Sequence, residues 1–409
     1  MSEKFLKYLG ELWKSYILLF ALFIWLRITF LRLDELLDGT TVIYSEKLVT
    51  HAIYYFSAGV LSLLGAIFLE KIQKELSIRI WISTTMISCL IFLFTFDGNI
   101  MRVLYPLLGG TSFGLGVPIT FSYFADHTSV VNRGRLGSIA FFLISLTLPV
   151  LTIASKILTI NIILALFMIF LGFNSIFFRF YKQENRIVRK ERIRYSHILT
   201  DKKFLHYFIS WCMFCFIDAL EAPLLEDFLI NTFGSPFRDF VLFLETIVTS
   251  FSILVVGFLI DLYGRKRVLI YGFVSLGVAH ATAGVFAYSI LSWYIYSIIA
   301  GIALGFFIVI FVFTIWGDIS PKNAREKYYA AGVLPYLFGG FISELSMPHV
   351  TAIPISSSFS LASFFLFLAV IPLTYAPETL PEKVIRRREL REYVEKAKKI
   401  REKYEKTGD

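Results

Sequence analysis

The sequence predicts an all-α polytopic membrane protein, in which twelve transmembrane helices form two pseudo-symmetric six-helix bundles. The first reason is composition, because 56% hydrophobic residues, 17% charged residues and a mean hydropathy of +0.69 are too apolar for a soluble domain of 409 residues. The second is that the apolar residues gather in twelve segments, each near the roughly 20 residues that a helix needs to cross a bilayer. The third is a strongly basic stretch that separates the first six segments from the last six.

The first apolar segment follows Lys4, Lys7 and Lys14 and lacks a small-residue cleavage site, so it is predicted to be a retained helix and not a signal peptide. The twelve predicted membrane segments, in chain order, are Tyr16–Leu33, Val49–Leu69, Ile78–Phe96, Met101–Ala125, Leu136–Ile157, Ile160–Phe180, Phe204–Ile230, Phe240–Ile260, Val268–Tyr288, Ile290–Ile315, Tyr328–Ser346 and Ile353–Tyr375.

The basic residues predict the orientation. If both termini are placed in the cytoplasm, 34 of the 40 lysines and arginines lie on that side and five lie on the other. Positive residues favour the cytoplasmic side, so we expect a multi-pass protein of the plasma membrane with both termini inside the cell. This asymmetry also accounts for the net charge of +9, and nucleic acid is not an expected partner.

The basic stretch divides the chain into an N-terminal bundle (1–181), a cytoplasmic linker (182–203), a C-terminal bundle (204–376) and a charged cytoplasmic tail (377–409) that is predicted to be helical. An internal repeat supports this division, since four features recur at one offset of 192 residues. The four pairs are Gly65 and Gly257, Gly109 and Gly301, Asp126 and Asp318, and Arg133 and Arg325.

A short polar loop between two apolar segments carries the clearest motif. It runs from Gly257 to Arg267 and reads GFLIDLYGRKR. Gly257 allows close approach of a neighbouring helix, Gly264 permits the turn and Asp261 lies near a helix N-terminus as a counter-charge. Arg265 and Lys266 hold the loop on the cytoplasmic side. This pattern resembles the loop that marks the major facilitator superfamily of secondary transporters; the alternative is an ordinary basic loop.

The repeated acid and arginine, Asp126 with Arg133 and Asp318 with Arg325, resemble a second element of that superfamily. The stretch Pro377-Glu378-Thr379 resembles the sugar porter branch after its last helix, although aspartate stands where that branch usually carries glutamate. The alternative reading of Asp126 and Asp318 is solvated charge at helix ends.

The first half lacks the loop motif, because Leu69 stands at the position equivalent to Asp261. We expect Glu70, Lys71 and Lys74 to act there in shifted geometry. If these charges close the cytoplasmic side, the second half carries most of the closure, in a cluster of Asp261, Arg265 and Arg325 with Asp318 nearby.

Ionisable residues inside membrane segments are costly and therefore candidate functional groups. Arg27 lies midway along the first segment, and Asp218 and Glu221 lie three residues apart on one face of the seventh, before Pro223. The offset of 192 sends Arg27 to Ala219, so we expect Arg27 and one of these acids to face each other across a central cavity. A structural ion pair or a wet helix end remains the alternative.

Glu245 is a further candidate for substrate or proton coupling, while His51, His280 and Glu344 are weaker ones. A lone membrane histidine is more often a packing residue than a proton carrier. Cys89, Cys212 and Cys215 fall in apolar segments, so no disulfide framework, metal site or cofactor is expected.

The sequence contains no nucleotide-binding, metalloprotease or serine-hydrolase motif, so an enzyme is not predicted. The resemblance implies a monomeric secondary active transporter that moves a small polar solute by alternating access, with substrate bound near the midplane. A buried acid favours proton-coupled symport. The alternatives are a uniporter, a sodium-coupled carrier, or a transporter-like sensor or scaffold without transport.

Overall fold

The computed structural model describes residues 3–38, 44–94, 99–180, 193–381 and 390. The first half contains α1 (Glu3–Asp38), α2 (Tyr44–Leu69), α3 (Lys74–Leu93), α4 (Asn99–Asp126), α5 (Arg133–Ile157) and α6 (Ile160–Phe180), and the short α7 (Tyr195–Thr200) follows. The second half contains α8 (Lys202–Phe233), α9 (Ser235–Tyr263), α10 (Arg265–Val285), α11 (Ile290–Phe307), the π-helix η1 (Ile308–Thr314), α12 (Ile315–Ile319), α13 (Arg325–Ser346), the 3₁₀-helix η2 (Met347–Ala352), α14 (Ile355–Leu368) and α15 (Val370–Tyr375).

These helices confirm the twelve predicted membrane crossings. Eleven described helical stretches are long and apolar enough to span a bilayer, and α6 adds an apolar stretch whose described part runs from Ile160 to Ile176. The tenth crossing is the continuous stack of α11, η1 and α12, and the twelfth joins α14 to α15. Several helices begin before the predicted apolar segment, as α1 does, because backbone hydrogen bonding continues beyond the hydrocarbon core. The end of the predicted third segment and most of the predicted tail helix lie outside the described residues.

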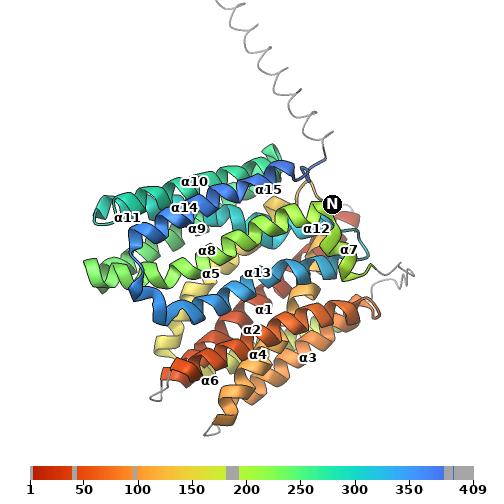
Figure 1. The fold of residues 1–409 in the computed structure, drawn as a ribbon. Coiled ribbons are helices and arrows are strands. Elements are labelled where there is room, and N and C mark those ends of the chain that lie inside the picture. Colours follow the sequence, from red (N-terminus) through yellow and green to blue (C-terminus); the bar gives the residue numbers. More distant parts are fainter. Residues whose placement is uncertain (1–2, 39–43, 95–98, 181–192, 382–389, 391–409) are drawn as a thin grey trace, which may run out of the picture.

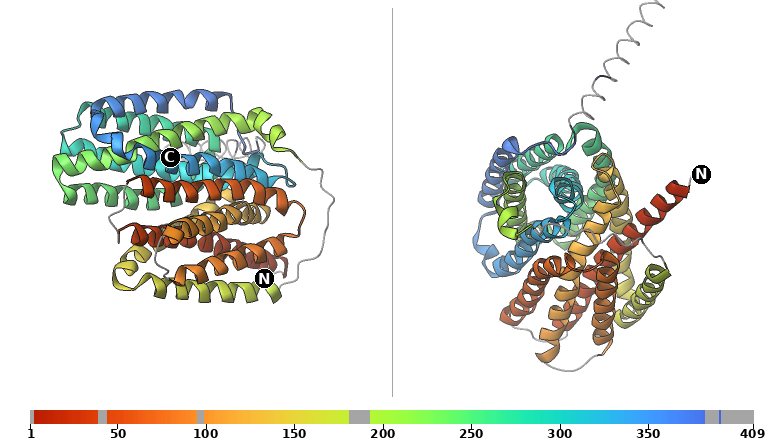
Figure 2. Two further views of the ribbon diagram at one scale, coloured as in Figure 1. Left: turned by 60° about the horizontal axis from the view of Figure 1, so that its bottom comes forward. Right: turned by 90° about the vertical axis from the view of Figure 1, so that its right-hand side faces the viewer.

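The twelve crossings form two groups of six. In Figure 1 and Figure 2 the red-to-yellow helices of the first half lie together, beside the green-to-blue helices of the second half. The internal repeat extends to the helix boundaries, since adding 192 to α3 gives 266–285, close to α10, and adding it to α5 gives 325–349, close to α13. The pseudo-symmetric pair of bundles is therefore confirmed.

Two long seams join the halves, α5 against α9 and α2 against α13. The repeat relates these seams to each other, because α2 corresponds to α9 and α5 corresponds to α13. Glycines make close approach possible in the first seam. A Cβ atom added to Gly257 would lie 2.9 Å from the backbone oxygen of Gly134 and closer still to the Ser138 side chain.

Large apolar side chains cover the outside of the bundles. Phe56, Ile157, Phe173 and Phe243 each expose 60% or more of their surface, which is costly in water and expected in lipid. Polar groups instead gather inside and at one end of the helices, where α4, α9 and α12 end and α5, α10 and α13 begin. We call this the motif end, and the opposite one the far end.

Candidate functional site

Asp261 ties the two halves together at the motif end. Its carboxylate accepts hydrogen bonds from the backbone N–H groups of Gly134, at 3.2 Å, and Arg135, at 2.9 Å, in the first turn of α5. The partial positive charge of that helix terminus favours the carboxylate. On the other side Asp261 lies 3.0 Å from Nη2 of Arg265. The acid of the loop motif thus caps a helix of the opposite half.

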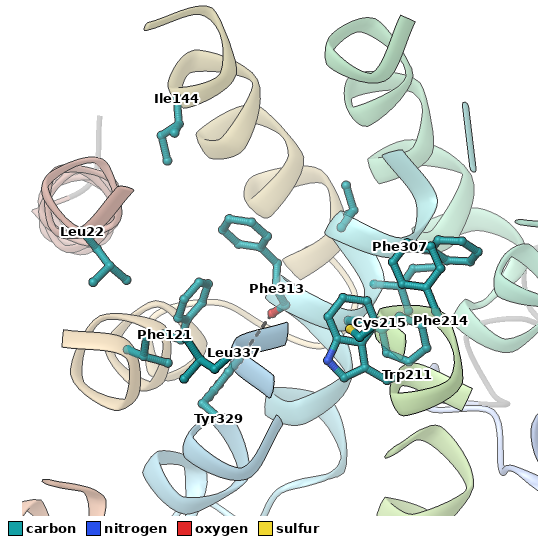
Figure 3. Close-up of a cluster of buried hydrophobic side chains, with 14 of the residues drawn as sticks. Leu22, Phe121, Ile144, Trp211, Phe214, Cys215, Phe307, Phe313, Tyr329 and Leu337 are labelled. Carbon is teal, nitrogen blue, oxygen red and sulfur yellow. Dashed lines mark hydrogen bonds between the residues drawn. The ribbon is translucent and has the colours of Figure 1, made fainter. Parts of the chain in front are cut away.

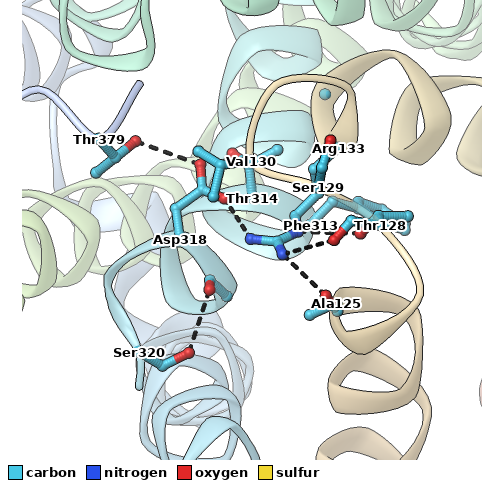
Figure 4. A network of polar contacts seen from close by, with 12 residues as sticks. Ala125, Thr128, Ser129, Val130, Arg133, Phe313, Thr314, Asp318, Ser320 and Thr379 are labelled. Carbon is cyan, nitrogen blue, oxygen red and sulfur yellow. Dashed lines mark hydrogen bonds and ion pairs between the residues drawn. The ribbon is translucent and has the colours of Figure 1, made fainter. Parts of the chain in front are cut away.

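Two acid–arginine pairs cross between the halves in reciprocal fashion, and Figure 4 shows the first of them, between Arg133 and Asp318. Arg133 of α5 pairs with Asp318 of α12, and Arg325 of α13 pairs with Asp126 of α4 at 2.5 Å. The repeat relates one pair to the other, so the two copies of the element exchange arginines. Arg133 and Asp318 have fully buried side chains, and removing one partner would leave the other charge uncompensated.

Arg265 joins this exchange to the loop motif, since its Nε lies 3.0 Å from Asp318 Oδ2. Asp318, Arg265 and Asp261 therefore form one continuous charged chain, as expected. Arg325, which was expected in the same cluster, instead takes Asp126 as its partner. The sequence identified these groups but assigned Arg325 to the acids of its own half.

Glu378 holds the turn between α9 and α10. Gly264 occupies this turn with φ of 98°, a conformation that favours glycine. The Glu378 carboxylate accepts hydrogen bonds from the backbone N–H groups of Arg265, at 2.9 Å, and Lys266, at 3.0 Å. The Lys266 ammonium donates to the carbonyl of Thr374, at 2.6 Å. The segment after the last helix thus fixes the loop motif in place.

The first half contributes charges in shifted positions. Glu70 pairs with Lys327 of α13 at 2.7 Å. Lys74 pairs with Asp126 and, at 3.1 Å, with Glu326. The pairs Glu70–Lys327 and Lys74–Glu326 cross to the second half, and Lys74 also contacts Asp126, the acid that pairs with Arg325. Together with the reciprocal pairs, they close the motif end of the protein.

A layer of aromatic side chains lies just inside this charged closure (Figure 3). The Phe121 ring of α4 lies 5.4 Å from the Tyr329 ring of α13 and 5.3 Å from the Phe313 ring of η1, between ring centroids. The Phe141 ring of α5 lies 5.5 Å from that of Phe313. Tyr329 donates a hydrogen bond to the Phe313 carbonyl at 2.9 Å. These contacts join the halves and form the floor of a cavity.

The central cavity above this floor has a volume of about 420 Å³ and is lined by both halves. The first half contributes residues of α1, α2, α4 and α5, and the second contributes residues of α8, α11, η1, α12 and α13. The π-helical segment lies beside it, and such segments are frequent at functional sites. The cavity therefore lies between the two bundles, with side chains of both in its wall.

Asp218 of α8 lines this central cavity and is an exposed residue. In the described part of the chain its carboxylate has neither a hydrogen bond nor an ion pair. Asp218 also lines a side pocket of about 100 Å³ within the second half. The two spaces share Phe214, Ala222 and Leu304, so Asp218 lies where they meet.

Glu221, one turn along α8, lies in the side pocket and pairs with His280 of α10. Its Oε2 atom is 2.5 Å from Nε2 of His280. The other ring nitrogen, Nδ1, lies 2.8 Å from the Leu276 carbonyl, which can only accept. Nδ1 therefore carries a hydrogen and donates it. Both side chains are buried, with 6% and 3% of their surface exposed.

Glu245 of α9 lines the same side pocket and also a groove of about 360 Å³ between α5 and α9. Its carboxylate has no hydrogen bond or ion pair with a described residue, but it shares the pocket wall with the Glu221–His280 pair. Three candidate acids from two helices, Asp218, Glu221 and Glu245, thus surround one pocket. Pro223 does not interrupt α8, which runs unbroken from Lys202 to Phe233.

Arg27 lies elsewhere. It is half-buried, and its Nε donates to the Thr152 hydroxyl of α5 at 3.1 Å. It lines neither the central cavity nor the side pocket, and it forms no ion pair with any described residue. The structure therefore does not bring Arg27 to Asp218 or Glu221. Arg27 and the two acids lie at similar depth along their helices. The rotation of each helix about its own axis, however, decides which way the side chain points.

Glu344 lies at the far end of the central cavity, 3.8 Å from Lys47 Nζ and 3.8 Å from His51 Nε2 of α2. The sequence named Glu344 only as a weaker candidate. It also gave His280 little weight, because nothing near His280 in the chain reveals its partner 59 positions away. The apolar aromatic lining of the cavity was not anticipated either, since aromatic residues occur throughout the chain.

A family model described as Major Facilitator Superfamily matches residues 222–403. No curated protein matches the chain by sequence. Solved structures share the fold at low identity. The proton:xylose symporter XylE has a TM-score of 0.69 at 14% identity, over 91% of this chain and 97% of that one. The E. coli fucose:proton symporter FucP has 0.70 at 12%, over 90% and 98%, and the human organic anion transporter MFSD10 has 0.67 at 14%, over 88% and 99%.

Proposed function

Because the chain has the fold of the major facilitator superfamily and its second half matches the family model, we propose that it is a secondary active transporter working by proton-coupled symport. The resemblance predicted from the loop between Gly257 and Arg267 is confirmed at the level of the fold, and the family model that matches residues 222–403 supports the superfamily. The solute binds in the central cavity, and the two bundles rock about it.

The observation that carries proton coupling is the contact between Glu221 and His280. Nδ1 of His280 is committed to the Leu276 carbonyl, so the 2.5 Å contact at Nε2 needs one proton between the two atoms. That proton sits either on the histidine, opposite a carboxylate, or on the glutamate, opposite a neutral ring. Without it, two acceptors would face each other. The pair is therefore a buried group that holds one proton in this conformation.

The surroundings of the pair suit a coupling role. The side pocket connects the pair to Asp218 at the central cavity and to Glu245 at the groove between α5 and α9. Rocking of the halves changes the α5–α9 seam and thus the access of water to Glu245. A proton reaching the pair by this route and a solute reaching Asp218 would be carried in the same movement.

The orientation follows from charge. We place the motif end and both termini in the cytoplasm and the protein in the plasma membrane, because 34 of the 40 lysines and arginines then lie inside the cell. The closed motif end corresponds to a conformation whose cavity is sealed from the cytoplasm. Transport requires no second chain in this arrangement, so the working unit is a monomer.

The test uses purified protein in liposomes. A thermal-shift screen of sugars, amino acids, carboxylates and organic cations selects a ligand, whose uptake is then measured under an imposed pH gradient. Concentrative uptake that a protonophore abolishes is expected. Glu221→Gln should lose gradient-driven uptake while retaining exchange of bound ligand, because the amide cannot carry the proton. Asp227→Asn changes an acid of the same helix that lines neither the side pocket nor the central cavity, and it should behave like the wild type.

Other outcomes point to other functions. Uptake that is indifferent to a protonophore and to the pH gradient indicates a uniporter, and uptake that needs sodium indicates a sodium-coupled carrier. Binding without movement of the ligand indicates a sensor or scaffold, the alternative suggested by the incomplete loop motif of the first half. Each of these results contradicts proton symport.

A further inference from the structure

The lining of the central cavity restricts the chemistry of its ligand. Eleven of its 27 lining residues are aromatic. Among these described residues there is no lysine, arginine, histidine, asparagine or glutamine, and the only charged ones are Asp218 and Glu344. The aromatic residues are Phe23, Tyr55, Phe113, Phe121, Phe141, Trp211, Phe214, Phe311, Trp316, Tyr329 and Tyr336.

The two acids of the lining differ in their surroundings. Glu344 at the far end lies within 3.8 Å of both Lys47 and His51. Asp218, in contrast, has no charged partner among the described residues, although it lies against a largely apolar wall. An unpaired carboxylate in such a place is unfavourable unless something positive approaches it.

The side pocket adds to the negative character of this region. Within it the charge of Glu221 is offset by His280, whereas the carboxylate of Glu245 pairs with no described residue. The second oxygen of Glu221, Oε1, is buried and accepts no hydrogen bond from the described residues. Arg27 of α1 donates to Thr152 and lines neither space. A positive group is therefore missing from a site arranged around acids.

We propose that the transported solute is an organic cation with an apolar, aromatic-sized body. Its charged group lies against Asp218 at the junction of the two spaces, and its body packs on the aromatic wall formed by Trp211, Trp316 and their neighbours. The faces of aromatic rings carry partial negative charge and attract cations, most strongly when water is excluded. This inference deepens the proposed transport function, and rests on it only in taking the central cavity as the solute site.

Other solute classes fit this lining poorly. A sugar presents many hydroxyl groups, which need paired donors and acceptors when buried, and the cavity wall contains no carboxamide side chain. An anion would face Asp218 without a cation to hold it. The resemblance in fold to sugar symporters therefore does not extend to the chemistry of the lining.

A series of ligands of matched shape tests the proposal by calorimetry on the purified full-length protein in detergent. Benzyltrimethylammonium is the cation, neopentylbenzene its neutral isostere and phenylmethanesulfonate the corresponding anion. We expect saturable binding of the cation, with the neutral compound at least about tenfold weaker and the anion not binding. Equal or tighter binding of the anion or of the neutral compound, no saturable binding of the cation, or tighter binding of D-xylose would overturn the proposal. This comparison uses the wild-type chain and needs no variant to fold.

Variants locate the binding site. Asp218→Asn should weaken cation binding about tenfold or more, whereas Asp218→Glu, which keeps the charge, should restore most of it. Asp227→Asn removes an acid of the same helix that does not line either space, and should bind like the wild type. Unchanged binding in a folded Asp218→Asn protein would exclude Asp218 as the contact.

Failure of this inference is distinguishable from failure of the proposed function. Charge-selective binding without uptake driven by a pH gradient would leave the cation site in place and remove proton symport. Gradient-driven uptake of a sugar or an anion would keep symport and remove the cation site. Binding and uptake are measured on the same preparation, so one set of samples decides both.

Discussion

At the scale of single residues, Asp261 shows how the loop motif acts. Its carboxylate contacts the first turn of α5 in the opposite half and Arg265 in its own. Only 1% of its side chain is exposed. The motif residue is therefore a contact between halves, and its energy is available only when the motif end is closed. Opening that end separates the carboxylate from the α5 terminus.

Asp261→Asn should favour opening of the motif end, because a neutral amide interacts more weakly with a helix N-terminus and with arginine. Coupling of about 1–3 kcal/mol corresponds to a shift of about five- to 150-fold in the ratio of open to closed protein. Spin labels on Ser129 and Lys322, exposed positions of the two halves at this end, report the distance between them.

The control for this prediction is Asp239→Asn on the same helix. Asp239 lies at the far end, where its side chain is 67% exposed beside Arg238. It should leave the distance distribution unchanged. A distribution that Asp261→Asn does not alter would show that the contact contributes nothing to closure.

At the scale of elements, the turn between α9 and α10 depends on a residue more than a hundred positions further along the chain. Gly264 permits the turn through its positive φ, but Glu378 supplies the acceptors for the first N–H groups of α10. The segment after α15 is thus part of the loop motif in space. Thr379 extends it by donating to Asp318 at 3.3 Å.

Glu378→Ala should lower the stability of the protein by about 0.5–2 kcal/mol, the range for loss of a helix cap. The measurement is thermal unfolding in detergent, combined with hydrogen exchange of the amides of residues 265 and 266, which should exchange faster. Glu226→Ala, which removes an exposed acid from a surface pair, should change neither quantity. Protection of these two amides that survives in Glu378→Ala would show that another group caps α10.

At the scale of the whole molecule, the internal repeat supplies two equivalent sets of contacts that close the motif end. The two acid–arginine elements exchange partners, and the two seams, α5 with α9 and α2 with α13, correspond under the same offset. Because each half supplies one acid and one arginine to the exchange, neither half closes the motif end alone. This arrangement suits two rigid bundles that move against each other.

The orientation of the whole molecule is tested by labelling single cysteines in intact cells, after replacement of Cys89, Cys212 and Cys215 by serine. Ser289→Cys lies at the far end, between α10 and α11, and Lys322→Cys lies at the motif end, and both positions are exposed. A membrane-impermeant maleimide should label the first in intact cells and the second only after permeabilisation, since basic residues stay inside. The reverse pattern would invert the topology.

The sequence predicted which residues belong to the site, but it did not predict which of them are partners. The cost of charge in a membrane selected Asp218, Glu221 and Glu245 one by one, and the structure gathers them round one pocket. The partner of Glu221 is His280 and that of Arg27 is Thr152, neither of which the sequence paired. Similar depth along two helices does not bring side chains together, because rotation about each helix axis decides which way they point.

The sequence by itself determined the twelve crossings, the two-bundle repeat and the expected orientation, because hydropathy, charge and spacing are properties of the chain that hold in any packing. The tertiary structure decided the contacts between halves. Only packing set Asp126 against Arg325 instead of its neighbour Arg133, and only packing left Asp218 unpaired at an aromatic cavity. Such contacts join residues up to about 300 positions apart, and they follow from how helices tilt, rotate and approach at small residues, which no local pattern encodes.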